Sequence, residues 1–72
     1  MVDPWKTFRS NIDKLVADRG ENGAEKLSVE VGVSYWSIIR WRNGERTPDL
    51  DSLDKLAKAT GYSVDALRNH AL

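Results

Sequence analysis

Arginine, aromatic and small polar side chains crowd into residues 34–44, which read SYWSIIRWRNG. Guanidinium groups donate hydrogen bonds to phosphates and guanine edges, serine and asparagine add further hydrogen bonds, and apolar groups contact thymine methyls. A core segment would not carry Arg40 and Arg42, and a purely solvated one would not carry Trp36 and Trp41. The mixture therefore favours binding chemistry on one side of the segment and core packing on the other.

A helix over residues 34–43 would separate these two roles, because residues three and four apart share a face. Ile38 and Trp41 are three apart and form an apolar stripe that we expect to face the core. Another side mixes aromatic, aliphatic and polar groups, namely Tyr35, Trp36, Ile39, Arg40 and Asn43. Two interpretations stay open on periodicity alone: either the thin core wraps around the helix and buries Trp36 as well, or this second face binds a partner.

The remaining residues give little indication of a catalytic site. His70 is the only histidine and sits near the end of the chain, cysteine is absent, and the acidic residues are spread along faces that we expect to be solvated. There is no glycine-rich phosphate loop and no cluster of metal ligands in the sequence. We therefore predict a protein that is not an enzyme and that uses no cofactor or metal.

The length and composition are those of one small globular domain. A chain of 72 residues buries only about 60% of its unfolded surface, and 40% hydrophobic with 31% charged residues fits a folded rather than a disordered chain. The formal net charge is zero, yet residues 5–19 and residues 34–47 each carry an excess of two positive charges. Because this charge is concentrated in two segments, nucleic acid remains a possible partner. No apolar run approaches membrane-spanning length.

Periodicity and capping signals predict an all-α fold of five short helices. Their expected ranges are 3–20, 22–32, 34–43, 51–61 and 63–70. The expected N-caps are Asp3 with Pro4 at the first helical position, Asn22 (or Gly23) with Glu25 completing a capping box, Ser34, Asp51 and Ser63. Gly20 and Gly44 follow the first and third helices, where a left-handed residue commonly ends a helix. Gly32 would allow a tight turn between the second and third helices.

The core is expected from the inward positions of these helices. They are Trp5, Phe8, Ile12, Leu15, Val16, Leu27, Val31, Ile38, Trp41, Leu53, Leu56, Ala57, Val64 and Leu67, with Leu50 packing just before the fourth helix.

Residues 27–67, LSVEVGVSYWSIIRWRNGERTPDLDSLDKLAKATGYSVDAL, resemble the lambda-repressor/Cro-like helix-turn-helix DNA-binding domains. The matching marks include Leu27, the Val-Gly-Val of residues 31–33, Asn43-Gly44, Pro48 and the Ser-Val-Asp of residues 63–65. The resemblance implies a compact bundle in which the second and third helices form the helix-turn-helix. It also implies that residues 1–72 are a single DNA-binding domain, or the N-terminal domain of a longer regulator.

The family lays its third helix in the major groove of double-stranded DNA, with the first residues of that helix nearest the bases. By this resemblance the candidates for base contact are Tyr35, Trp36, Ile39 and Arg40. The candidates for phosphate contact are Ser34, Ser37, Arg42, Asn43, Arg46 and Thr47, together with the N-terminus of the second helix.

The expected function is that of a sequence-specific transcriptional regulator, a phage or bacterial repressor working in the cytoplasm of a bacterial cell or phage-infected host. Its partner would be a double-stranded DNA operator. We expect a weak homodimer, formed mainly on DNA, through the apolar groups of the C-terminal region, Val64, Leu67 and Leu72. The alternative is a protein-interaction module or antitoxin of the same fold, which would use the Trp36/Ile39 patch on a protein partner.

Overall fold

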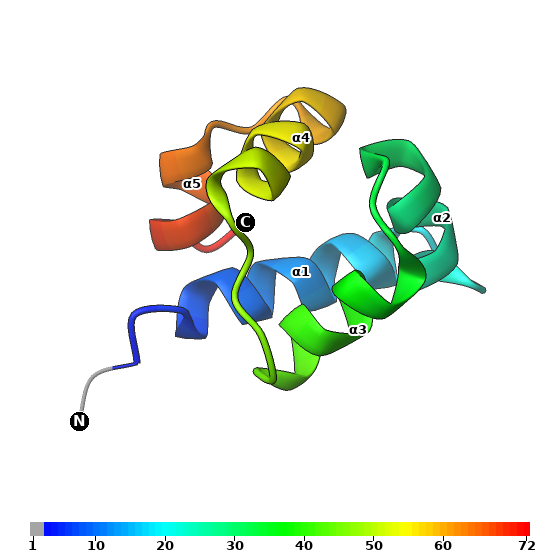
Figure 1. The fold of residues 1–72 in the computed structure, drawn as a ribbon, viewed down its shortest axis with the longest axis horizontal. Coiled ribbons are helices and arrows are strands. Elements are labelled where there is room, and N and C mark those ends of the chain that lie inside the picture. Colours follow the sequence, from blue (N-terminus) through cyan, green and yellow to red (C-terminus); the bar gives the residue numbers. More distant parts are fainter. Residues whose placement is uncertain (1–2) are drawn as a thin grey trace.

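The computed structural model describes residues 3–72, and the only regular secondary structure over that range is helical (Figure 1). In chain order the helices are α1 (Lys6–Asp18), α2 (Gly23–Val31), α3 (Tyr35–Asn43), α4 (Leu50–Thr60) and α5 (Val64–Asn69). The long helix α1 lies across the middle of the molecule and packs against α2, α3 and α5, while α4 packs against α2 and α5. The predicted all-α bundle of five short helices is therefore confirmed.

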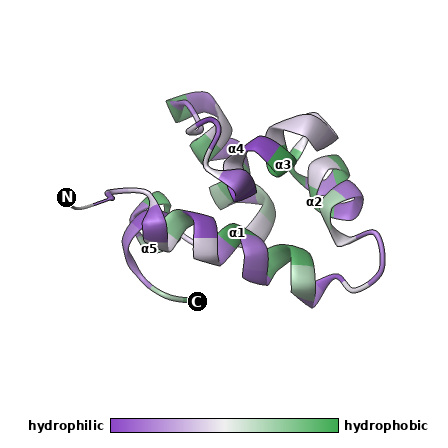
Figure 2. Ribbon diagram, turned by 90° about the horizontal axis from the view of Figure 1, so that it is seen from below, coloured by the Kyte–Doolittle hydropathy of each residue, from purple (hydrophilic) through white to green (hydrophobic). Residues whose placement is uncertain are grey.

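The core forms where the apolar faces of these helices meet. Hydrophilic and hydrophobic residues alternate along α1 and its neighbours, as amphipathic helices require (Figure 2). The fully buried side chains include Phe8, Ile12, Leu27, Ile38, Leu56 and Leu67. Val16, Ala57 and Val64 were also expected inside, and they are half-buried groups packed against the edge of this core.

The start of α1 differs from the prediction. Asp3 was expected to cap the helix and Pro4 to be its first residue, but the helix begins at Lys6, and the cap position, Trp5, makes no side-chain cap hydrogen bond. Asp3 instead accepts a hydrogen bond from the backbone N–H of Trp5 at 2.9 Å and pairs with Arg9. The Asp-Pro pair thus forms a turn ahead of the helix.

The capping box predicted for α2 is also wrong. Asn22 does occupy the cap position, but its backbone is left-handed, with φ of 59°, and its side chain makes no cap hydrogen bond. A capping side chain normally works from extended backbone, from which it reaches back to the second or third N–H of the helix. The tight loop before α2 imposes the left-handed shape, because it must bring Gly23 against the backbone of Val16, where a Cβ atom would come within 2.0 Å of the Val16 carbonyl oxygen.

Helix α4 begins two residues earlier than predicted, and with another cap. Asp49, not Asp51, is the N-cap, and its carboxylate accepts a hydrogen bond from the backbone N–H of Ser52 at 2.8 Å. Buried Pro48 anchors the preceding loop and leaves Asp49 in the extended conformation that a cap requires. Leu50 was expected to pack on the core, but it lies on the outer side of the first turn and is 83% exposed.

Other boundaries agree with the prediction. Ser34 and Ser63 cap α3 and α5, each accepting a hydrogen bond from the backbone N–H three residues on. Gly20 and Gly44 both have the predicted positive φ. The described helices include none that is long and apolar enough to cross a membrane.

Candidate nucleic-acid interface

The turn between α2 and α3 fixes the orientation of α3 relative to α2. Gly32 has φ of 85°, and the backbone N–H groups of Gly32 and Val33 both donate to the carbonyl of Ser28, at 2.9 and 3.1 Å. Ser28 is buried, and its hydroxyl donates to the carbonyl of Glu25 at 2.7 Å, so no polar group is left unpaired there. The two helices thus form a compact helix-turn-helix, with α3 also resting on α1.

Helix α3 has the two faces that its spacing predicted. Ile38 is fully buried and Trp41 is 3% exposed, with the Trp41 ring meeting Phe8 edge-on at 6.1 Å between centroids. Trp36 is 61% exposed. The interpretation in which the core wraps around α3 and buries Trp36 is therefore wrong.

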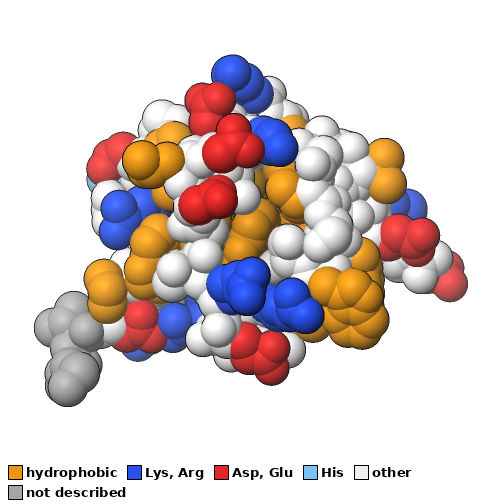
Figure 3. All heavy atoms as spheres, in the orientation of Figure 1, with side chains coloured by type: hydrophobic (Ala, Val, Ile, Leu, Met, Phe, Trp, Pro, Cys, Tyr) orange, Lys and Arg blue, Asp and Glu red, His pale blue; other side chains and the backbone are white. Residues whose placement is uncertain are grey.

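The exposed aromatic side chains form one apolar projection at the start of α3. The rings of Tyr35 and Trp36 meet edge-to-face at 5.3 Å between centroids, and Tyr35 is itself 41% exposed. Ile39 is half-buried and lies at the base of this projection. In the space-filling view a large hydrophobic group lies beside Lys and Arg side chains over α3 and the loop that follows it (Figure 3).

The basic side chains of this surface differ in whether they are already paired. Arg40 and Arg46 are exposed and form no ion pair with any residue in the range 3–72. Arg42, a predicted phosphate contact, is paired with Asp13 of α1, with 2.8 Å between its Nη2 and the carboxylate Oδ1. Both side chains of this pair are well exposed, and exposed pairs contribute little, so a phosphate could displace Asp13 at small cost.

The predicted polar contacts border the same surface. Ser34 is occupied as the cap of α3, and its hydroxyl lies 3.0 Å from that of Ser37. Asn43 is exposed at the last turn of α3. Ser37, Arg46 and Thr47 line a cleft between α3 and the start of α4, with Trp41, Pro48, Asp49 and Ser52 on its other walls. The structure thus brings the predicted base and phosphate candidates onto α3 and the loop that follows it.

Sequence reasoning missed Arg9 as a member of this surface. Arg9 belongs to α1, yet it lines a cleft with Gly44, Arg46 and Thr47 from the loop after α3. Its guanidinium pairs with Asp3, and this hydrogen bond is the main cause that lowers the pKa of the Asp3 carboxyl below its ordinary value. The only sign in the sequence was the excess positive charge of residues 5–19, which gives no position.

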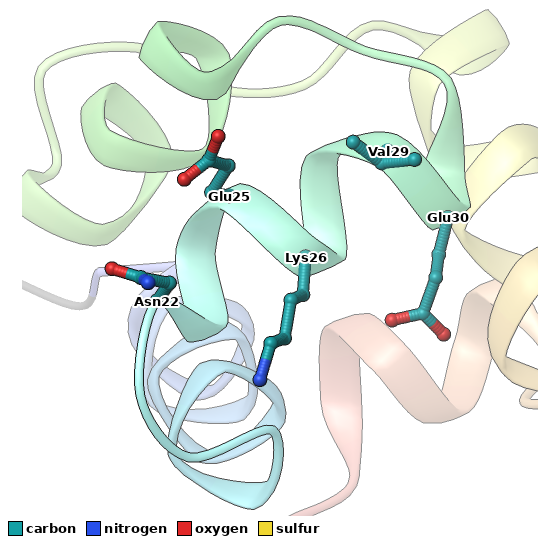
Figure 4. Close-up of a pocket in the computed structure, with 5 residues that line it drawn as sticks. All are labelled: Asn22, Glu25, Lys26, Val29 and Glu30. Atoms are coloured by element: carbon teal, nitrogen blue, oxygen red, sulfur yellow. The ribbon is translucent and has the colours of Figure 1, made fainter.

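The outer face of α2 carries a shallow hollow of a different character (Figure 4). It is lined by Asn22, Glu25, Lys26, Val29 and Glu30. Lys26 and Glu30 are both already engaged by Arg19, at the end of α1, so neither of these charged groups is free for a ligand. Glu30 is paired with Arg19, which is the main cause of its lowered pKa, and Lys26 donates to the Arg19 carbonyl. This hollow gives no geometry for a binding site, and within residues 3–72 no three metal-ligating side chains cluster.

Comparison with known proteins agrees with this geometry. The helix-turn-helix family model matches residues 24–67, more than half of the chain. An uncharacterized HTH-type transcriptional regulator of Haemophilus influenzae is 38% identical over 56 residues, which cover 78% of this chain. The match spans only 21% of that relative's length. No solved structure matches the chain. The match over α2, the turn, α3 and the helices that follow shows that the chain belongs to the lambda-repressor/Cro-like helix-turn-helix family.

Proposed function

We propose that this chain is a sequence-specific DNA-binding domain that regulates transcription by placing α3 in the major groove of double-stranded DNA. The observation that carries the proposal is the outward face of α3, where exposed Trp36 and Arg40 lie side by side on a helix whose other face is buried. A major groove admits one α-helix, and an apolar ring with an adjacent guanidinium suits its thymine methyls and guanine edges. Membership of a helix-turn-helix family supports the same use of α3.

In this proposal the residues divide by their place along α3. The first turns would read bases, through Tyr35, Trp36 and Arg40, with Ile39 as the apolar base of the contact. Phosphates would be held by polar and basic groups on the flank of α3, in its last turn and in the loop that follows it. These residues are Ser34, Ser37, Arg42, Asn43, Arg46 and Thr47. Phosphate contacts fix the register of the helix and carry no sequence information themselves.

We further propose that the regulator is a repressor of phage or bacterial type that acts in the cytoplasm, with residues 1–72 as one binding domain. A single domain of this kind reads few base pairs, so we expect two copies on half-sites about one helical turn apart. The C-terminal surface predicted for pairing is smaller than expected. Leu67 is fully buried, and Val64 and Leu72 are packed against the core. Pairing through this region should therefore be weak, with DNA holding the two copies together.

A protein partner is the second candidate, because the Trp36/Ile39 patch is apolar, although basic side chains border it. The two functions respond differently to salt. Binding to DNA releases counterions and weakens steeply as salt rises, whereas an apolar protein interface does not.

The test is a titration of a duplex, selected by the protein from a random pool, with the parent, Arg40→Ala and Trp36→Ala. We expect Arg40→Ala to lose about 1–3 kcal/mol of discrimination at one base pair, and Trp36→Ala to lose affinity while remaining folded. Equal loss by Arg40→Ala on all sequences would make Arg40 a phosphate contact. A folded Trp36→Ala with undiminished DNA affinity would favour the protein partner.

A further inference from the structure

Arg9 lies in a cleft between the start of α1 and the loop after α3. Aromatic groups form part of the wall, including Trp5 and Trp41, and the loop contributes Gly44, Arg46 and Thr47. Two basic residues distant in sequence, Arg9 and Arg46, thus face the same cleft, together with a threonine that carries a hydroxyl. Arg46 and Thr47 are already candidates for phosphate contact, which makes the role of Arg9 the open question.

The backbone of the loop is shaped to let Arg9 approach. Gly44 has φ of 74°. A Cβ atom placed on it would lie 3.3 Å from Arg9 Cδ, 3.6 Å from Nε and 3.7 Å from Nη1. The absent side chain therefore leaves room for the Arg9 stem and for the near side of its guanidinium. The remaining nitrogen, Nη2, donates to the carboxylate of Asp3.

Two nitrogens of the Arg9 guanidinium, Nε and Nη1, remain without a partner in the described structure. These two nitrogens donate no hydrogen bond to any residue in the described part of the chain. The Arg9 side chain is 31% exposed, so part of it is accessible to solvent. Nε and Nη1 point to opposite sides of the guanidinium, so each can give a phosphate oxygen one charge-assisted hydrogen bond.

We propose that Arg9 binds a phosphate of the DNA backbone, next to the contacts made by Arg46 and Thr47. The inference rests on the proposed function and extends the interface from α3 to α1. If the first turns of α3 enter the major groove, its last turn and the following loop lie at the groove wall, where the backbone runs. The cleft opens at that end of α3, so Arg9 meets a phosphate and not a base edge.

The test is the salt dependence of binding to one duplex of fixed sequence, measured with the full chain and its variants. Each phosphate contact contributes about 0.9 to the slope of log affinity against log salt. We expect Arg9→Gln to make that slope shallower by about one, with similar loss on any sequence, and Arg9→Lys to restore it because the charge is kept. The matched control is Arg19→Gln, which removes an ion-paired arginine at the opposite end of α1, one whose partner is Glu30 of α2.

The outcomes separate this inference from the proposed function. A parent slope retained by Arg9→Gln, or an equal loss in Arg19→Gln, would overturn the Arg9 assignment while leaving the α3 interface in place. A parent chain with no salt-dependent binding to any duplex would overturn both. Thermal melts of each variant show that the slopes compare folded proteins, and restoration by Arg9→Lys identifies the lost group as a charge.

Discussion

Replacing each of the two tryptophans of α3 by alanine should separate stability from binding. Trp41 is 3% exposed and meets Phe8 across the core, so Trp41→Ala removes a buried aromatic group, which costs about 3–5 kcal/mol. A domain of this length has about 4–11 kcal/mol of stability in total. Since a loss of 1 kcal/mol lowers the melting temperature of such a domain by about 4–8 °C, Trp41→Ala should melt at least about 12 °C lower or fail to fold.

Trp36→Ala is the matched variant, because it makes the same change on the same helix. Trp36 is 61% exposed, and exposed substitutions usually change stability by less than about 0.5 kcal/mol, which is a shift of about 4 °C or less. Circular dichroism melts of the parent and both variants measure this directly. A Trp36→Ala protein destabilised as strongly as Trp41→Ala would refute the assignment of the two faces of α3.

Three further changes test how the domain is held together. Asn11 is buried and donates hydrogen bonds to the carbonyls of Leu67 and His70, each at 2.9 Å. Asn11→Leu should therefore lower the free energy of unfolding, measured in urea, by about 1–3 kcal/mol or more. An unchanged unfolding midpoint would contradict this. Ser63→Ala removes the cap of α5 and should cost about 0.5–2 kcal/mol by the same measurement. Hydrogen bonds from Asn69 and then His70 lower the pKa of Asp65 below its ordinary 3.8. The stability that the Asp65 carboxylate contributes is therefore present above that value and lost as the pH falls through its lowered pKa. Asp65→Asn should lower the melting temperature at about pH 6 but hardly at all at about pH 2, whereas an equal effect at both values would refute the linkage.

Sequence alone predicted the helices whose ends carry strong local signals. Ser34 and Gly44 mark the ends of α3, because a serine cap and a left-handed glycine are both local preferences of the chain. The start of α4 was missed because Asp49 and Asp51 are equally good caps by type. The choice between them depends on how buried Pro48 places the loop, which is a tertiary effect.

The candidate interface, like the helix boundaries, could be predicted from the sequence only in part. Helical period predicted the burial of Trp41 but left open whether Trp36 is buried as well, and the family resemblance favoured the exposure of Trp36 that the structure shows. The long-range neighbours of the arginines were not predicted, because Arg42 pairs with Asp13 and Arg9 lies beside Gly44, residues far apart in the sequence. No local pattern encodes which of several acidic residues will meet a given arginine.

The claim that α3 reads the major groove is tested most directly by methylation interference on a duplex selected by the protein from a random pool. Methylation of guanine at N7 modifies the major groove, whereas methylation of adenine at N3 modifies the minor groove. We predict an enriched motif in which N7 methylation of one guanine blocks binding of the parent and no longer matters to Arg40→Ala. Failure to enrich any motif, or interference from adenine N3 alone, would contradict the account.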